Sequence, residues 1–184
     1  MDGCADLDED GVADCMQTLL SNSTFDANVM NWNADAGASL TWDPRDALAA
    51  AGSGTALLTA ESSAFDAGGA SLFTAGQCVR VSGGQIVLAY ANALVDDGQD
   101  ESGKAAIYVY FYDASECTGT STSSFSTPQP LDASTGTWLT LKAALLTSAA
   151  THSARVMLAI EKPFVAQSFH ARFDNLLLKT ESAN

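Results

Sequence analysis

The sequence predicts an all-β protein, an antiparallel β-sandwich of the jelly-roll type, and three observations support this fold class. Short apolar stretches recur along the 184 residues, with turns rich in Gly, Ser, Thr and Asp between them. Neither the long apolar heptads of helices nor the strand–helix–strand rhythm of a parallel sheet is present. Hydrophobic residues make up 47% of the chain, which is enough to fill the core of one domain.

The first half of the chain contains short expected strands between turn-forming residues. Residues 16–20 are an apolar run and are expected to form the first strand. Residues 39–42 are a second expected strand, which ends at the turn around Pro44. A Gly-Ser-Gly turn then leads into a third expected strand at residues 55–59.

The second half of the chain carries stronger β patterns. Residues 104–113 are the clearest strand, because apolar side chains alternate with tyrosines and both faces carry large side chains. A stretch rich in Ser, Thr and Pro at residues 115–130 is expected to be a long loop. The remaining expected strands are residues 77–82, 85–94, 137–142, 154–162 and 169–179.

The N-terminal stretch has the spacing of a calcium loop. Residues 6–14 follow the pattern D-x-D-x-D-G-x-x-D, in which alternate carboxylates can turn inward as oxygen ligands. Gly11 permits the sharp bend that wraps such a loop round an ion. A solvated acidic terminus is the alternative, but the cysteines that flank the stretch argue against it. The expected Ca²⁺ ligands are Asp6, Asp8, Asp10 and Asp14.

Two known calcium motifs can be compared with this loop. The EF-hand pattern fits in part, since its twelfth position would be Gln17, where that motif has a bidentate Glu. Residues 2–15 more closely resemble a thrombospondin type 3 calcium repeat, which has the same acidic pattern and a nearby cysteine. This resemblance implies Ca²⁺ as the bound ion and an extracellular setting. We expect a calcium-binding acidic loop at residues 1–17 and a jelly-roll β-sandwich domain at residues 18–184.

The charge of the chain excludes two classes of partner. With 8 basic and 22 acidic residues, the net charge is −14. Such a chain is unsuited to nucleic acids and to anionic membrane surfaces, which are negative as well. No apolar run approaches the ~20 residues of a membrane-spanning helix, so membrane insertion is not expected. Acids follow Met1 directly and no signal peptide is present, so we expect a secreted form to be a mature piece.

The four cysteines allow three disulfide pairings. The local choice joins Cys4 to Cys15 and leaves Cys78 for Cys117. The first disulfide would close a short loop and contribute roughly 3 kcal/mol by restricting the unfolded chain. The second would tie a strand to the turn that follows residue 113. Paired cysteines and a calcium loop together indicate an oxidising, extracellular or cell-surface location.

Several short motifs occur in an informative order along residues 18–179. Residues 22–26 (Asn-Ser-Thr-Phe-Asp) are followed by an Asn-Trp pair and then by the Gly-Ser-Gly turn. A Thr-Trp pair opens the stretch at residues 137–142, and residues 173–178 (Phe-Asp-Asn-Leu-Leu-Leu) close the series. Taken in this order, the motifs resemble those of the jelly-roll carbohydrate-binding modules.

This resemblance implies two antiparallel sheets, one of them concave, and a glycan as the ligand. It also implies a structural Ca²⁺ held by the acid after the first Phe and by the acid of the closing strand, which are Asp26 and Asp174 here. The chain departs from the family at Ser23 and Thr24, where Gly-Asp or Gly-Glu is common. Turn capping and surface charge are the alternative roles of the two acids.

A candidate glycan groove follows from the alternation of side chains along strands. If the apolar side chains of residues 104–113 face the core, the tyrosines there face solvent or line a groove. The same argument turns the Arg and His side chains of two later strands outward. Ordinary β packing is the alternative role of a tyrosine stripe. The expected ligand-binding residues are Tyr108, Tyr110, Tyr112, Arg155, His170 and Arg172.

Catalytic motifs are absent from the sequence. No G-x-S-x-G, H-E-x-x-H or P-loop is present, and the chain has only 2 histidines. The sequence therefore predicts a secreted, calcium-stabilised, non-catalytic module that binds a glycan or surface polysaccharide. The alternative is a structural subunit of an extracellular, calcium-dependent filament or surface assembly, in which identical subunits or neighbouring domains meet through Ca²⁺.

Overall fold

The computed structural model describes residues 5–60, 70–99, 103–127, 131–132, 136–163 and 168–183. This part of the chain contains eleven strands and two 3₁₀ turns, and none of its helical segments is long and apolar enough to cross a membrane. In chain order the elements are η1 (Asp14–Met16), β1 (Asn33–Ala34), β2 (Ala38–Asp43), β3 (Thr55–Ala60), β4 (Ala70–Arg80), β5 (Gln85–Leu94), β6 (Lys104–Tyr112), η2 (Ser115–Cys117), β7 (Ser121–Ser126), β8 (Leu131–Asp132), β9 (Leu139–Leu146), β10 (Ser153–Pro163) and β11 (Phe169–Ser182).

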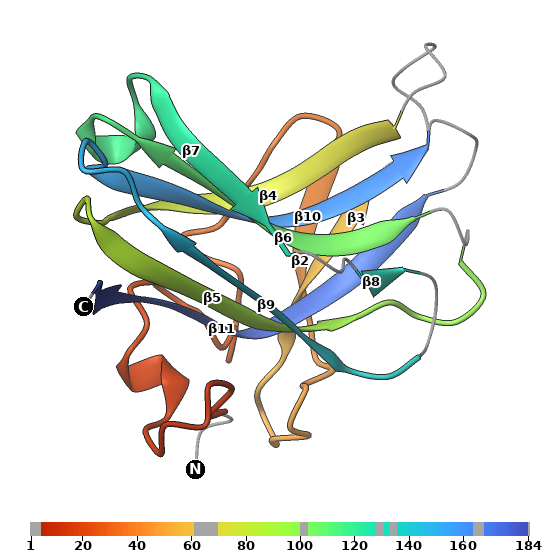
Figure 1. Cartoon of the computed structure of the whole chain (residues 1–184). Coiled ribbons are helices and arrows are strands. Elements are labelled where there is room, and N and C mark those ends of the chain that lie inside the picture. The colour runs from red at the N-terminus through yellow and green to blue at the C-terminus, as the bar shows by residue number, and fades with distance from the viewer. Residues whose placement is uncertain are drawn as a thin grey trace.

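The strands form two antiparallel sheets that pack face to face (Figure 1). Sheet A has the order β1-β4-β10-β6-β7, and β8 also pairs with β6. Sheet B has the order β2-β3-β11-β5-β9. Strands that are distant in the sequence lie side by side in both sheets, as β4 and β10 do. The predicted all-β antiparallel sandwich is confirmed.

The core lies between the two sheets and comes from alternate residues of the long strands. β6 contributes Ile107, Val109 and Phe111, all of which are buried. β10 and β11 contribute their own alternate apolar residues, including the fully buried Leu158 and Phe173. The alternate side chains of β6, β10 and β11 that were predicted to point inward do lie in the core. The prediction is confirmed, because each of these strands has one face in the core and one outside it.

Two expected elements have a different secondary structure, and two expected strands have other bounds, since 77–82 overlaps β4 (Ala70–Arg80) and 137–142 overlaps β9 (Leu139–Leu146). Residues 16–20 do not form a strand, because the carbonyl oxygen of Asp14 accepts the N–H groups of Gln17 and Thr18 and turns the chain back at η1. The expected loop at 115–130 contains η2 and strand β7, which pairs with β6. Strand pairing is made by the backbone, so an edge strand of Ser and Thr needs no apolar pattern. Residues 128–130 lie outside the described part.

The N-terminal segment is docked on sheet B beside β11 (Figure 1). The Leu19 N–H donates to the Leu178 carbonyl at 2.8 Å, and the Leu178 N–H donates to the Thr18 hydroxyl at 3.0 Å. Lys179 of β11 forms ion pairs with Asp8 and Asp10 of the acidic loop. Backbone and charge contacts therefore hold the loop against the sandwich.

Candidate ligand-binding face and metal sites

The outer face of sheet A carries a hollow of about 300 Å³, called the sheet A hollow below. It lies over β4, β10 and β6, on the side opposite the core. Its described lining consists of Asp35, Leu72, Thr74, Tyr110, Tyr112, Arg155 and Met157. Two of the three expected tyrosines and the expected Arg155 are therefore brought together on one face.

The third tyrosine, Tyr108, is held beside the sheet A hollow rather than lining it. Its hydroxyl donates to the Glu161 carboxylate of β10. Burial, together with Glu161, raises the pKa of Tyr108 to about 12, so the phenol stays protonated. The Tyr108 and Tyr110 rings are stacked with centroids 6.5 Å apart. Tyr108 thus supports Tyr110 and fixes the orientation of its ring.

Arg155 forms the polar part of the sheet A hollow with Asp35, a residue that the sequence did not single out. Arg155 lies opposite Tyr110 in the register of β10 and β6. Its Nη2 donates to Asp35 Oδ1 at 2.6 Å, and the other Asp35 oxygen accepts the Thr74 hydroxyl. Asp35 follows the short strand β1, and only the pairing of β1 with β4 brings it here. Donors and acceptors therefore hold fixed directions beside the tyrosines.

His170 and Arg172 do not join the tyrosines, so a single groove containing all of the expected residues is wrong. Both lie on β11 in sheet B, whereas Tyr110 and Arg155 belong to sheet A. Alternation along a strand predicts which face a side chain takes but not which sheet the strand enters. In sheet B, Arg172 forms ion pairs with Asp43 and Asp96.

Asp96 is the centre of this separate ion cluster. Arg45 Nη1 lies 2.5 Å from one of its oxygens, and His170 Nε2 and Arg172 contact the other. Burial opposes ionisation of Asp96, but hydrogen bonds from Arg172 and His170 outweigh it and lower the pKa to about 2. The opposite charges of the cluster offset one another. Its ion pairs therefore hold β11 to its neighbouring loops.

Substituting Asp96→Asn is expected to flatten the acid dependence of stability. A carboxylate with a lowered pKa stabilises the fold above its ordinary value of 3.8, and this contribution is lost as the pH falls toward 2. We expect a loss of roughly 1 kcal/mol at neutral pH after allowing for solvent screening. Melting temperatures from pH 5 to pH 2 would show it, with the exposed neighbour Asp97→Asn as control. An equal slope in the wild type and Asp96→Asn would contradict the assignment.

In the acidic loop, three of the four expected calcium ligands lie close together. Carboxylate oxygens of Asp6, Asp8 and Asp14 lie within 4.8 Å of one another. Asp14 is only 2% exposed, and burial, with the nearby charges of Asp8 and Asp6, raises its pKa to about 6. Oδ1 of Asp8 and Oδ1 of Asp14 are buried without a hydrogen-bond partner. Orphaned carboxylate oxygens of this kind suit a hard cation such as Ca²⁺.

The fourth expected ligand, Asp10, is directed elsewhere. Its carboxylate accepts hydrogen bonds from Lys179 Nζ at 3.0 Å and from the Gln17 amide. Lys179 also contacts Asp8, so the lysine supplies part of the positive charge that the loop requires. The residues that remain for an ion are Asp6, Asp8 and Asp14.

The second expected calcium site gathers around Asp174 of β11. Asp174 is fully buried and accepts the Ala47 N–H at 3.0 Å. Burial raises its pKa to about 7, and the charges of Asp46 and Asp26 add to the effect. Asp26 accepts the Ser53 hydroxyl at 3.1 Å. Asp26 therefore lies near enough for its charge to act on Asp174.

Asp46 is a third acid at this site, and the sequence marked it only as part of a turn. Its Oδ1 accepts the N–H groups of Leu48 and Ala50, while its Oδ2 is buried with no hydrogen-bond partner. Asp174 lies on the face of β11 opposite its core neighbour Phe173. The segment that contains Asp46 and Ala47 then folds over Asp174 and buries it. Unlike Asp6, Asp8 and Asp14, these three acids do not form a group whose ligand atoms all lie within 4.8 Å of one another, so a Ca²⁺ here would also need backbone or water oxygens.

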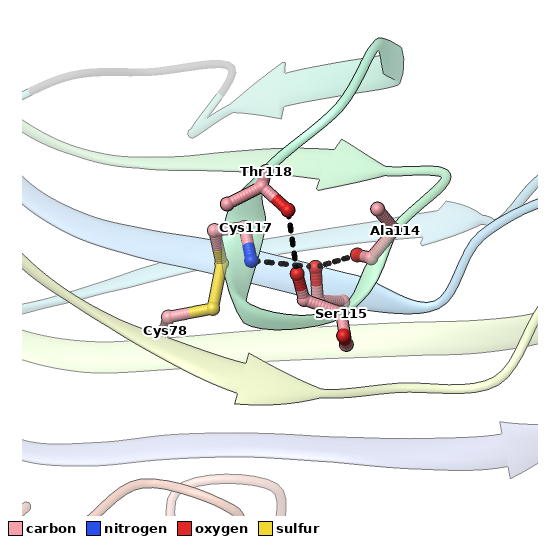
Figure 2. Close-up of a disulfide and its surroundings, with 6 residues drawn as sticks. Cys78, Ala114, Ser115, Cys117 and Thr118 are labelled. Atoms are coloured by element: carbon pink, nitrogen blue, oxygen red, sulfur yellow. Dashed lines mark hydrogen bonds between the residues drawn. A yellow bond between two sulfur atoms is a disulfide. The ribbon is translucent and has the colours of Figure 1, made fainter.

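One of the two expected disulfides is present in the described residues. Cys78 of β4 is joined to Cys117 of η2, with their Cα atoms 5.9 Å apart (Figure 2). Cys15 is disulfide-bonded as well. Cys4, its expected partner, lies outside the described residues. At least one strand-to-turn crosslink therefore stabilises sheet A.

Comparisons with known proteins support the fold. No protein-family model matches the chain, and a comparison with curated proteins finds no relative. The CBM22-1 xylan-binding domain of Paenibacillus barcinonensis Xyn10C superposes with a TM-score of 0.60 at 11% identity, covering 88% of this chain and 94% of that domain. A CBM4 structure gives a TM-score of 0.57 at 15% identity, covering 88% of this chain and 99% of the other.

A larger protein contains the same fold as one part. The enzymatically active domain of tailspike protein 4 from bacteriophage CBA120 gives a TM-score of 0.65 at 12% identity over 89% of this chain. This chain spans only 21% of the length of that protein. At such low identities the likeness establishes the fold, a jelly-roll β-sandwich, and function must be argued from the site.

Proposed function

We propose that this chain is a non-catalytic, calcium-stabilised module that binds a glycan on the outer face of sheet A, outside the cell. The observation that carries the proposal is the sheet A hollow, where Tyr110 and Tyr112 stand beside Arg155 and Asp35. The fold that the chain shares with the xylan-binding domain and with the CBM4 structure agrees with this assignment.

The lining suits a sugar chain in two respects. Alternate residues on one strand face lie about 7 Å apart, so Tyr110 and Tyr112 can meet successive apolar faces of a glycan. Arg155, Asp35 and Thr74 offer hydrogen-bond donors and acceptors to sugar hydroxyls from fixed positions. Aromatic surface and oriented polar groups in one concave site are what binding of a polyhydroxylated ligand needs.

The same lining supports a binding role rather than hydrolysis. Glycoside hydrolysis uses a pair of carboxyl groups that flank the scissile bond. Among the described residues that line the sheet A hollow, Asp35 is the one acid, and both of its oxygens already accept hydrogen bonds. The Cys78–Cys117 disulfide supports an oxidising, extracellular location.

Substituting Tyr110→Ala is expected to weaken glycan binding at least about tenfold, because a stacked aromatic face is lost from the site. A glycan array that includes xylans and β-glucans would find the ligand, and titration calorimetry would then measure the two affinities. His170→Ala is the matched control, since His170 lies on the other sheet. If the folded protein binds no polysaccharide with or without chelator, or if Tyr110→Ala binds as well as the wild type, the proposal fails.

A structural subunit is the second candidate, and one observation favours it. The edge strand β9 exposes Leu139 and Leu146, with 43% and 58% of their surface accessible. Edge strands with exposed apolar residues can pair with a neighbouring chain. Electron microscopy of concentrated protein with Ca²⁺ and with chelator tests this role. A protein that stays monomeric in both conditions excludes it.

A further inference from the structure

The turn around η2 lies across one end of the outer face of sheet A. η2 contacts three neighbouring strands, β4, β10 and β6. These are the strands that carry the sheet A hollow. The turn therefore spans the width of the candidate binding face rather than standing beside it.

Two anchors hold this turn down on the sheet (Figure 2). The Cys78–Cys117 disulfide joins it covalently to β4. The hydroxyl of the fully buried Ser153 donates to the Ala114 carbonyl at 2.7 Å and accepts the Cys117 N–H at 3.0 Å. Glu116 and Cys117 both have positive φ angles, of 63° and 54°, which non-glycine residues adopt rarely. Such a turn keeps its shape because its anchors hold it.

The strand register places the turn directly beside the tyrosines. Arg155 of β10 lies between Cys78 and Tyr110 in one row across the sheet. In the next row Ser153, which carries the turn, lies opposite Tyr112. The covalently fixed turn therefore lies just beyond the tyrosine end of the sheet A hollow, although it contributes no residue to the described lining.

From its tyrosine end, the described lining of the sheet A hollow extends along β4, away from the η2 turn. Along β4 it passes back from the row of Cys78 to Thr74 and then to Leu72. Leu72 is 44% exposed, so the described lining opens toward solvent at that end. Among the described residues, the η2 turn therefore stands beyond one end of the hollow, and the Leu72 end is exposed to solvent.

Resting on the proposed function, we propose that the sheet A hollow receives the end of a glycan chain and not an interior stretch. The terminal sugars lie against the η2 turn, where Tyr110 and Tyr112 contact their rings and Arg155 and Asp35 meet their hydroxyls. The chain then extends past Thr74 and Leu72. An interior stretch must leave the site in both directions, and the pinned turn occupies one of the two paths.

The first test varies the number of chain ends at constant mass. Xylan and mixed-linkage β-glucan are each offered whole and after partial cleavage, and the amount of protein bound per gram is measured. Because one concave site holds one chain end, chains cut to about a tenth of their length are expected to bind about ten times more protein. Equal binding per gram before and after cleavage would overturn this inference and leave the proposed function standing. Binding to neither polymer nor to any other glycan of the array would overturn both.

The second test removes the covalent anchor. Cys78→Ser combined with Cys117→Ser releases the η2 turn, and binding per gram of uncut polymer is expected to rise about tenfold as interior stretches gain access. The control combines Cys4→Ser with Cys15→Ser, which removes the other two cysteines. In this control, the amount of protein bound per gram of polymer is expected to rise with the number of chain ends as it does in the intact protein. A folded double variant that keeps the end-dependence of the intact protein would overturn the role of the pinned turn. Where the variant does not fold, the chain-cleavage measurement on the intact protein decides the proposal.

Discussion

Chelation of calcium is expected to lower the melting temperature of the protein by about 5–10 °C. Asp174 is fully buried, with Asp26 and Asp46 as negatively charged neighbours. A cation among these acids offsets their mutual repulsion and satisfies the orphaned Asp46 Oδ2. Calcium at about a hundred times its dissociation constant contributes about 2.7 kcal/mol to stability, which corresponds to this temperature shift in a chain of this size.

Scanning calorimetry in CaCl₂ and in EGTA measures this effect, and matched variants divide it between the two sites. Asp174→Asn is expected to remove the part of the shift that arises at β11. Asp8→Asn is expected to remove the part that arises in the acidic loop, where Asp6, Asp8 and Asp14 lie together. Asp97→Asn is the surface control. A melting temperature that is the same in CaCl₂ and in EGTA would show that neither site holds calcium.

Truncating Phe111 to alanine is expected to lower the free energy of unfolding by about 3–5 kcal/mol. The ring is fully buried between the sheets, with its centroid 5.8 Å from that of Phe125. Its removal loses apolar contact and leaves a cavity that the rigid sandwich can only partly close.

Urea unfolding of Phe111→Ala against the wild type tests this prediction. Leu146→Ala is the matched control, because this side chain is 58% exposed and its loss is expected to cost at most about 0.5 kcal/mol. Phe111 points to the core while its neighbour Tyr110 lines the sheet A hollow, so molecules that remain folded should keep their affinity for glycan. A loss below about 1 kcal/mol would place Phe111 outside the cooperative core.

Much of the fold could be predicted because its pattern is local. The alternation of Ile107, Val109 and Phe111 with tyrosines reports which residues of β6 meet the core, and this needs no knowledge of the partner strands. β5 was predicted with its observed limits, Gln85–Leu94, since turn residues mark both of its ends. β7 was missed because Phe125 is its one apolar residue, too few to show alternation, and its pairing with β6 is made by backbone groups.

The candidate sites were predictable to the extent that their residues lie close in the sequence or fit a family motif. Spacing alone predicted Asp6, Asp8, Asp10 and Asp14 as calcium ligands, and the first, second and fourth of these lie together. The resemblance to carbohydrate-binding modules predicted Asp26 and Asp174. Other contacts depend on long-range pairing. Asp35 reaches Arg155, which is 120 residues further along the chain, only because β1 and β10 both pair with β4.

The sequence by itself determined that the chain is an antiparallel sandwich, that an acidic loop precedes it, and which side chains of β6, β10 and β11 face outward. These properties depend on local periodicity and spacing, which each segment carries alone. Only the tertiary structure decided that β10 and β11 lie in different sheets. This separates Arg155 from His170 and Arg172, while the pairing of β11 with β3 brings the segment that contains Asp46 to Asp174. It also laid the η2 turn across the tyrosine face, because the disulfide partners and the sheet neighbours are set by packing of the whole chain.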